Sequence, residues 1–186
     1  MSFYSEKDLK KFGFKSLGKN VLISEKTSIY NAKNVEIGNN VRIDDYTVIS
    51  AGKGGIKLGN NIHISVFCSL LGAGHILMND FSGLSSRVAI YSSTDDYSGK
   101  FMTNPTVSSD YTNVKSGEVI LGKHVIIGAG SIILPNVTIG DYSAIGALSL
   151  VSKNIDKLKI AVGSPARAVK NRDDNLINLE CKFLKK

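Results

Sequence analysis

Apolar residues recur at every sixth position over much of the chain, most clearly in residues 119–153. There each hexad carries an aliphatic residue in the same phase, and the next position is small in five of the six hexads. A period of six fits neither an amphipathic helix nor a simple alternating strand, but it fits short strands joined by tight corners. The aliphatic positions in phase are Leu121, Ile127, Ile133, Ile139, Ile145 and Val151.

The same period extends toward the N-terminus with two shifts of phase. It is faint at Ile23 and Ile29, becomes regular from Ile37 to Ile90, and is offset by short insertions at residues 51–55 and near Gly74. A six-residue strand cannot bury its apolar face alone, so neighbouring coils must cover one another. With three hexads to a triangular coil, the fifteen aligned aliphatic positions from Ile37 to Val151 predict an all-β parallel β-helix of about five coils.

The repeat divides the chain into three parts. We predict a β-helix domain over residues 20–162, interrupted by a protruding loop at residues 92–118. Residues 1–19 form an N-terminal segment with a short helix capped by Ser5, and residues 163–186 form a basic, partly helical C-terminal segment. The loop has 27 residues and carries apolar anchors such as Tyr97 and Phe101, so we expect an ordered functional arm.

Composition narrows the possible partners and the cellular compartment. Charged residues make up 21% of the chain and the net charge is +7, with basic residues gathered at both ends. No nucleic-acid recognition motif accompanies that charge, so we expect no nucleic-acid partner. No apolar run approaches the roughly 18 residues of a membrane span, and the first residues lack the apolar core of a secretory signal. We therefore expect a cytoplasmic protein without a membrane partner.

Metal chemistry is not expected either. Cys68 and Cys181 lack metal-ligand spacing and suggest no disulfide framework. The three histidines are not spaced like the zinc ligands of β-helical carbonic anhydrases, so a metal-dependent β-helical hydratase is the weakest of the functional hypotheses considered below.

Three segments resemble the hexapeptide-repeat acyltransferases, in particular sugar O- and N-acetyltransferases. They are HVIIGAGSIILPNVTIG, SAIGALSLVSK and AVGSPARAVKNR, and the resemblance covers roughly residues 20–172. It implies a left-handed β-helix, acetyl-CoA as the co-substrate, and a sugar or nucleotide-linked sugar as the acceptor. It also implies a homotrimer with active sites in the clefts between adjacent prisms.

Candidate cofactor residues follow from this resemblance. Small side chains would let the pantetheine arm lie against the backbone, and the resemblance places the arm along Ala129, Gly130 and Ala147. Residues aligned with Ser152, Lys153, Arg167 and Lys170 contact the cofactor in similar enzymes, and Arg172 adds positive charge for its phosphates. The alternatives are that the small residues only suit the corners and that the basic residues form a solvated tail.

The candidate catalytic residues depart from the family pattern. In many similar sugar acetyltransferases a histidine near the start of the loop is the general base, whereas the hexad phase puts Asp95 there and the loop contains no histidine. An exposed aspartate is a weaker base near neutrality than histidine. Asp95 and Asp96 would suit an amino sugar, which is nucleophilic once neutral, although residues 95–97 also fit a simple polar turn. His124 is a secondary candidate for the base.

These residues favour an acetyl-CoA-dependent sugar acetyltransferase. N-acetylation of an amino sugar, possibly nucleotide-linked and destined for surface polysaccharide, is slightly favoured over O-acetylation because the loop lacks a histidine. The alternative from another class is a non-catalytic trimeric β-helix that serves in binding or assembly.

Overall fold

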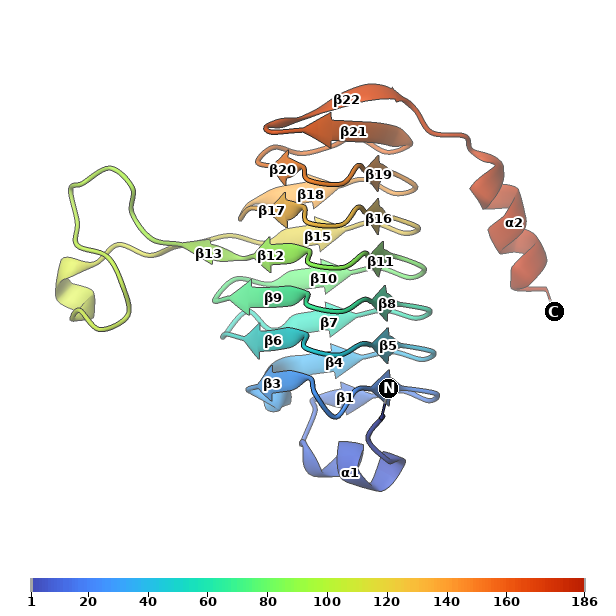
Figure 1. The fold of residues 1–186 in the computed structure, drawn as a ribbon, viewed down its shortest axis with the longest axis horizontal. Coiled ribbons are helices and arrows are strands. Elements are labelled where there is room, and N and C mark those ends of the chain that lie inside the picture. Colours follow the sequence, from blue (N-terminus) through green and yellow to red (C-terminus); the bar gives the residue numbers. More distant parts are fainter. Residues whose placement is uncertain (1, 186) are drawn as a thin grey trace.

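The computed structural model describes residues 2–185 and is a left-handed parallel β-helix with three faces (Figure 1). The chain passes through six successive triplets of short strands, one strand on each face, and a terminal hairpin follows. All fifteen aliphatic positions from Ile37 to Val151 in the hexad phase are buried, so the all-β fold and its inward residues are confirmed. The five expected coils are preceded by a sixth, whose Ile23 is also buried.

Each face is a sheet of parallel strands in which successive coils pair in register. The first face contains β1 (Ser16–Leu17), β4 (Val35–Ile37), β7 (Ile56–Leu58), β10 (Ile76–Met78), β15 (Val119–Leu121) and β18 (Val137–Ile139). The second contains β2 (Leu22–Ile23), β5 (Arg42–Ile43), β8 (His63–Ile64), β11 (Gly83–Leu84), β16 (Ile126–Ile127), β19 (Ala144–Ile145), β21 (Lys159–Gly163) and β22 (Ala166–Asn171). The third contains β3 (Ser28–Tyr30), β6 (Val48–Ala51), β9 (Ser69–Gly72), β12 (Ala89–Tyr91), β17 (Ile132–Ile133) and β20 (Leu150–Val151).

A second position in each hexad, two residues before the aliphatic one, also points inward because side chains alternate along a strand. This position is aliphatic in some coils and a serine, threonine or cysteine in others, and the hexad pattern did not predict it. The buried serines bond to backbone carbonyls: Ser131 Oγ donates to Gly146 O at 3.0 Å and Ser143 Oγ to Asp156 O at 2.7 Å. The polar members of the core are therefore satisfied within it.

Left-handed residues turn the chain at its corners. We call the corner between the first and second faces the first corner, that between the second and third faces the second corner, and that between the third face and the next coil the third corner. At the first corner, Asn20, Asn40 and Asn61 have φ of 56°, 55° and 57°. Asparagine tolerates this conformation, and the amide of Asn20 donates to Asn40 at 3.0 Å along the stack.

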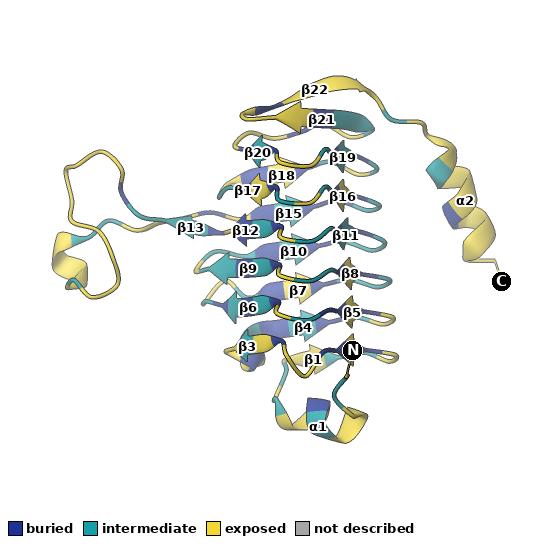
Figure 2. Cartoon of the chain, viewed as in Figure 1, coloured by how far each residue is buried: buried dark blue, intermediate teal, exposed yellow. Residues whose placement is uncertain are grey.

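Both ends of the prism carry additional structure. Helix α1 (Glu6–Lys11) covers the first coil with the buried Leu9, and Ser5 caps it by accepting from Asp8 N at 3.2 Å. The β21–β22 hairpin closes the other end. Helix α2 (Asn175–Phe183) then descends beside the first corner and is mostly exposed (Figure 2). A 3-10 turn, η1 (Ala32–Asn34), lies between β3 and β4.

The interrupting loop leaves the prism at the third corner, opposite α2 (Figure 1). Its base is a two-stranded antiparallel ribbon of β13 (Ser93–Thr94) and β14 (Lys115–Ser116), and a 3-10 turn, η2 (Ser109–Tyr111), lies near its tip. The predicted short terminal helices and protruding loop are thus present. No helix within residues 2–185 has the length and apolar character needed to cross a lipid bilayer.

Candidate active site

Asp95 follows the ribbon at the base of the loop, beside a hollow on the third face. The residue is half-buried, and its carboxylate has no hydrogen-bond or ion-pair partner among residues 2–185. This hollow has a volume of ≈ 610 Å³. A smaller hollow, of ≈ 310 Å³, lies on the second face. Its wall includes Tyr91, Thr94, Tyr97, Ile132, Leu134 and Leu150.

Asp96 is buried and its carboxylate holds a turn. Its Oδ1 accepts from Ser98 N at 2.8 Å and from Ser98 Oγ at 2.5 Å. These hydrogen bonds keep the pKa of Asp96 below its ordinary value, because they stabilise the ionised form. Of the two adjacent carboxylates proposed from the sequence, Asp95 is the one free to meet a ligand.

His124 lies at the first corner, away from the loop. Its ring is stacked between Phe81, at 4.6 Å between centroids, and Tyr142, at 5.3 Å. Its Nε2 is 3.3 Å from Glu180 Oε2 on α2 but makes no hydrogen bond there. The loop and α2 stand on opposite sides of the prism (Figure 1), so one chain does not bring His124 to Asp95. The surroundings of His124 are those of a packing residue.

Glu180 anchors α2 to this corner. Its carboxylate accepts from Lys123 Nζ at 2.6 Å and from Tyr142 Oη at 3.0 Å. The hydrogen bond from Lys123 keeps the pKa of Glu180 below its ordinary value. These contacts explain why a carboxylate is buried on an otherwise exposed helix.

Ala129, Gly130 and Ala147 line the second corner in successive coils. Ala129 and Ala147 are exposed, as a surface track for a cofactor requires. Gly128, which precedes Ala129, is small for a different reason. A Cβ at Gly128 would lie 2.4 Å from Ala147 N in the next coil, so the stacking of the coils requires glycine at this position. The exposure of the two alanines favours a surface role for their small side chains.

The basic cofactor candidates lie at two different corners. Arg167 is opposite Val162 near the tip of the β21–β22 hairpin, above the second corner, and Lys170 is opposite Ile160 further along the same hairpin. Ser152 and Lys153 are exposed after β20, at the third corner. A cofactor that contacts both groups must therefore span the third face or lie between two prisms.

Arg172, which the sequence offered for the cofactor phosphates, makes structural hydrogen bonds to the backbone. Its Nη1 donates to the carbonyls of His124, Tyr142 and Ser143 at 2.9, 3.1 and 3.1 Å. Burial keeps the pKa of this guanidinium below its ordinary value. Its position ties the C-terminal segment to the first corner, which was not apparent from the sequence.

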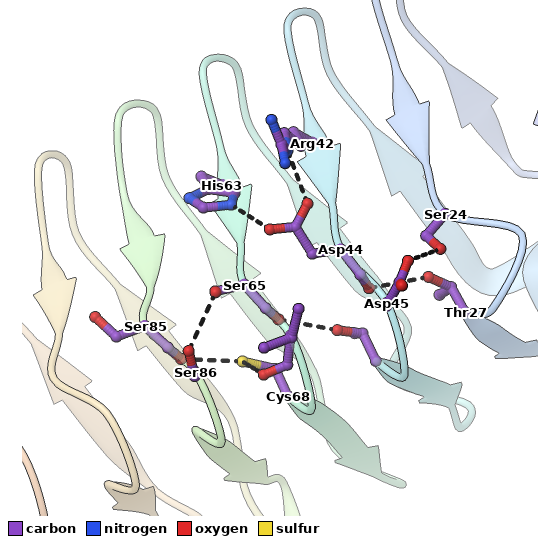
Figure 3. A network of polar contacts seen from close by, with 12 residues as sticks. Ser24, Thr27, Arg42, Asp44, Asp45, His63, Ser65, Cys68, Ser85 and Ser86 are labelled. Carbon is purple, nitrogen blue, oxygen red and sulfur yellow. Dashed lines mark hydrogen bonds and ion pairs between the residues drawn. The ribbon is translucent and has the colours of Figure 1, made fainter. Parts of the chain in front are cut away.

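Two serines at the second corner were not singled out from the sequence. Ser85 and Ser86 lie one coil below Ala129 and help to form the smaller hollow of ≈ 310 Å³ on the second face. Figure 3 shows them beside Ser65, with Ser65 Oγ 3.4 Å from Ser86 Oγ. The available signal was the hexad phase, because Ser85 and Ser86 occupy the places that Gly128 and Ala129 hold in the next coil.

A buried carboxylate organises the polar surface below these serines (Figure 3). Asp44 accepts from Arg42 Nε at 2.7 Å and contacts His63 Nε2 at 2.8 Å. Burial acts to raise the pKa of Asp44, but the hydrogen bonds from Arg42 and His63 outweigh burial, so the pKa lies below its ordinary value. Asp44 is therefore an ionised structural group.

Fold and site together define an acyltransferase built on hexapeptide repeats. The family model described as bacterial transferase hexapeptide (six repeats) matches residues 118–153, and the chain belongs to the hexapeptide-repeat acyltransferases. It is 50% identical over 183 residues to the dTDP-4-amino-4,6-dideoxy-D-glucose acyltransferase of Escherichia coli, covering 98% of this chain and 95% of that relative.

Solved structures extend the similarity. A variant of AntD, an N-acyltransferase from Bacillus cereus, in complex with dTDP and coenzyme A has a TM-score of 0.95 and 49% identity, covering 100% of this chain and 99% of that one. The same enzyme with dTDP and 3-hydroxybutyryl-CoA has a TM-score of 0.93 and 50% identity, covering 99% and 97%. A maltose O-acetyltransferase from Clostridium difficile is more distant, at 26% identity and a TM-score of 0.63, covering 90% and 75%.

Proposed function

We propose that this protein transfers an acyl group from acyl-CoA to the 4-amino group of dTDP-4-amino-4,6-dideoxyglucose. The observation that carries the proposal is the unpaired Asp95 carboxylate at the hollow, where a hydroxyl-acylating relative would have a histidine. The near-complete overlap with an acyltransferase for this nucleotide-linked amino sugar supports the same acceptor.

The chemistry suits a carboxylate. The neutral amine attacks the thioester carbonyl, a C–N bond forms, the C–S bond breaks, and CoA leaves as a thiolate. Asp95 accepts the proton lost by the amine, and that proton then passes to the departing CoA thiolate, which restores the Asp95 carboxylate. Because an amine needs less activation than a hydroxyl, an aspartate that orients it and accepts its proton is sufficient.

We propose acetyl-CoA as the donor, although the structure of the Bacillus cereus enzyme with 3-hydroxybutyryl-CoA makes a longer hydroxyacyl group the first alternative. O-acetylation remains the second candidate reaction because a maltose O-acetyltransferase has the same fold. Ala129, Gly130, Ala147, Ser152, Lys153, Arg167 and Lys170 are the residues that we assign to the cofactor.

The assignment of Asp95 has separate support. Solved variants of the Bacillus cereus enzyme replace one serine or one aspartate, ten positions apart. In this chain both Ser85–Asp95 and Ser86–Asp96 have that spacing. The Asp96 carboxylate is held by Ser98, which favours Ser85 and Asp95 as the matching pair.

Ser85 precedes the third-face strand β12 at the second corner, whereas Asp95 follows β12 and the ribbon strand β13 at the third corner. Six residues of extended chain between these corners separate them by roughly 20 Å. We therefore propose a homotrimer in which Asp95 of one subunit meets Ser85 and the cofactor track of its neighbour. The product would enter surface polysaccharide, and both substrates would be met in the cytoplasm.

The test measures acyl transfer by the purified protein, and the release of the CoA thiol is the readout. We expect turnover with dTDP-4-amino-4,6-dideoxyglucose and little with the 4-hydroxy sugar, using acetyl- and 3-hydroxybutyryl-CoA as donors. Asp95→Asn should lower kcat by about 10²- to 10⁴-fold without changing the melting temperature. Equal turnover by Asp95→Asn would remove the proposed role of Asp95, and preference for the hydroxyl sugar would favour O-acylation.

A further inference from the structure

The second corner carries a column of equivalent turn residues, most of them with exposed side chains. Its turn residues Tyr46, Phe67, Arg87, Gly130 and Leu148 have φ of 60°, 59°, 61°, 71° and 57°, so they occupy equivalent places in five successive coils. Backbone hydrogen bonds join neighbouring turns: Phe67 N donates to Asp45 O, Arg87 N to Val66 O, and Gly130 N to Ser86 O, each at 3.0 Å. The side chains of this column therefore stand one above another.

Aromatic rings and cations form the lower part of the column. Tyr46 and Phe67 stack with centroids 4.9 Å apart and an interplanar angle of 13°. Lys26 Nζ lies 5.3 Å from the Tyr46 centroid, and Arg87 Cζ lies 5.7 Å from the Phe67 centroid. Stacking against an aromatic face limits the freedom of the guanidinium before any ligand arrives.

The guanidinium of Arg87 has no ion-pair or hydrogen-bond partner within residues 2–185. The other arginines are engaged: Arg42 with Asp44, Arg167 with Ala166 O and Arg172 with three carbonyls. The nearest acid on the column, Asp45, is two coils below and pairs with Lys26. Arg87 is thus an exposed planar cation braced against an aromatic ring, which suits bidentate binding of phosphate oxygens.

The room for a ligand lies beside Arg87. Ser85 and Ser86 precede Arg87 at the same turn and line the ≈ 310 Å³ hollow. In the coil above, Gly130 has no side chain at the equivalent position, and the Leu148 side chain lies over it, with Cδ2 2.8 Å from where a Cβ would stand. The cofactor track at Ala129 and Ala147 lies one and two coils farther along. At about 4.8 Å per coil, a thioester reaching down this track and a diphosphate held at Arg87 would lie on the same corner.

We propose that Arg87, braced by Phe67 and Tyr46, binds the diphosphate of the nucleotide-linked sugar and so fixes the acceptor on this corner. The inference rests on the proposed function. CoA also contains a diphosphate, but the basic residues assigned to it, Arg167 and Lys170, lie in the β21–β22 hairpin at the far end of the column.

The test measures the affinity of dTDP and of CoA separately by titration calorimetry. Arg87→Gln should weaken dTDP binding by about tenfold to a hundredfold, because charge-assisted hydrogen bonds are lost, and change CoA binding by less than about twofold. Arg87→Lys should fall between the two, because it keeps the charge but loses the planar fork. Lys33→Gln, at an exposed site in η1, is the control for removing one positive charge.

Kinetics supply the second readout. Arg87→Gln should raise KM for the nucleotide sugar by a similar factor with a smaller change in kcat, and Phe67→Leu should raise it less, with melting curves checking the fold of each variant. Unchanged dTDP affinity in Arg87→Gln would overturn the proposal while leaving the proposed function intact. A selective loss of CoA binding would assign Arg87 to the cofactor and also overturn it, whereas a wild-type protein that binds no dTDP would contradict the proposed function itself.

Discussion

Three carboxylates near the candidate site differ in what surrounds them. Asp96 is held by Ser98, Asp44 by Arg42 and His63, and Asp95 by nothing within residues 2–185. Acidic side chains only a few residues or a few coils apart therefore have separate tasks. Two of them keep the scaffold in shape, and one is available to an amine.

Asp44 makes stability depend on pH. Its folded-state pKa lies below the usual value of about 3.9, so its contribution is fully present above that value and is lost as pH falls through the folded pKa. We expect the free energy of unfolding of the wild type to decline below about pH 4, and Asp44→Asn to be less stable by about 1–3 kcal/mol near neutrality and flatter with pH.

Urea unfolding between pH 3 and 7 checks this expectation, with Asp110→Asn in the exposed loop as the control. Parallel pH curves for the wild type and Asp44→Asn would show that Asp44 contributes no pH-linked stability.

At the scale of the coil, the hexad phase was enough to predict the inward residues, because that information is local and repeats. The contacts at the corners were not predictable in this way. His124 stacks on Phe81, which precedes it by 43 positions because the interrupting loop lies between their coils. Likewise, no local pattern shows that Asp96 is held by a turn or that Arg87 rests on Phe67.

Stacked coils also limit which glycines accept a side chain. A Cβ at Gly38 would lie 2.5 Å from Gly59 O in the next coil, whereas a Cβ at Gly83 would have its nearest neighbour, His63 O, at 3.5 Å. We expect Gly38→Ala to lower the free energy of unfolding by about 1–3 kcal/mol. Gly83→Ala should be neutral or stabilise the protein by about 0.4–1 kcal/mol through the unfolded chain.

Chemical denaturation of the two glycine variants under identical conditions provides the measurement. Equal stability of Gly38→Ala and Gly83→Ala would mean that adjacent coils separate easily at their corners.

At the scale of the molecule, the candidate residues are split between the second and third corners. A single prism therefore presents two half-sites, and a ring of three prisms can join each half-site to its complement. Light scattering should give a mass near 60 kDa, three times the 20.0 kDa of the chain.

Mixed trimers test whether the site is shared. Ser85→Ala and Asp95→Asn should each be nearly inactive, while co-expression of the two should restore about a quarter of the wild-type sites, because some neighbouring pairs supply both intact residues. Mixtures without recovered activity, despite confirmed mixed trimers, would place both residues in the site of one chain or remove one of them from it.

Because the coils are regularly spaced, distances between residues along the second corner are fixed in multiples of one coil. Each coil advances the surface by about 4.8 Å, so the distance from the cofactor track to Arg87 changes only in whole steps. A nucleotide sugar with a longer reach cannot be accommodated by small adjustments along this axis. Arg87 and Ala129 lie in adjacent coils, so inserting one complete coil between them is the smallest change that lengthens this distance. The loop between the same two coils leaves at the third corner and keeps the spacing at the second corner unchanged.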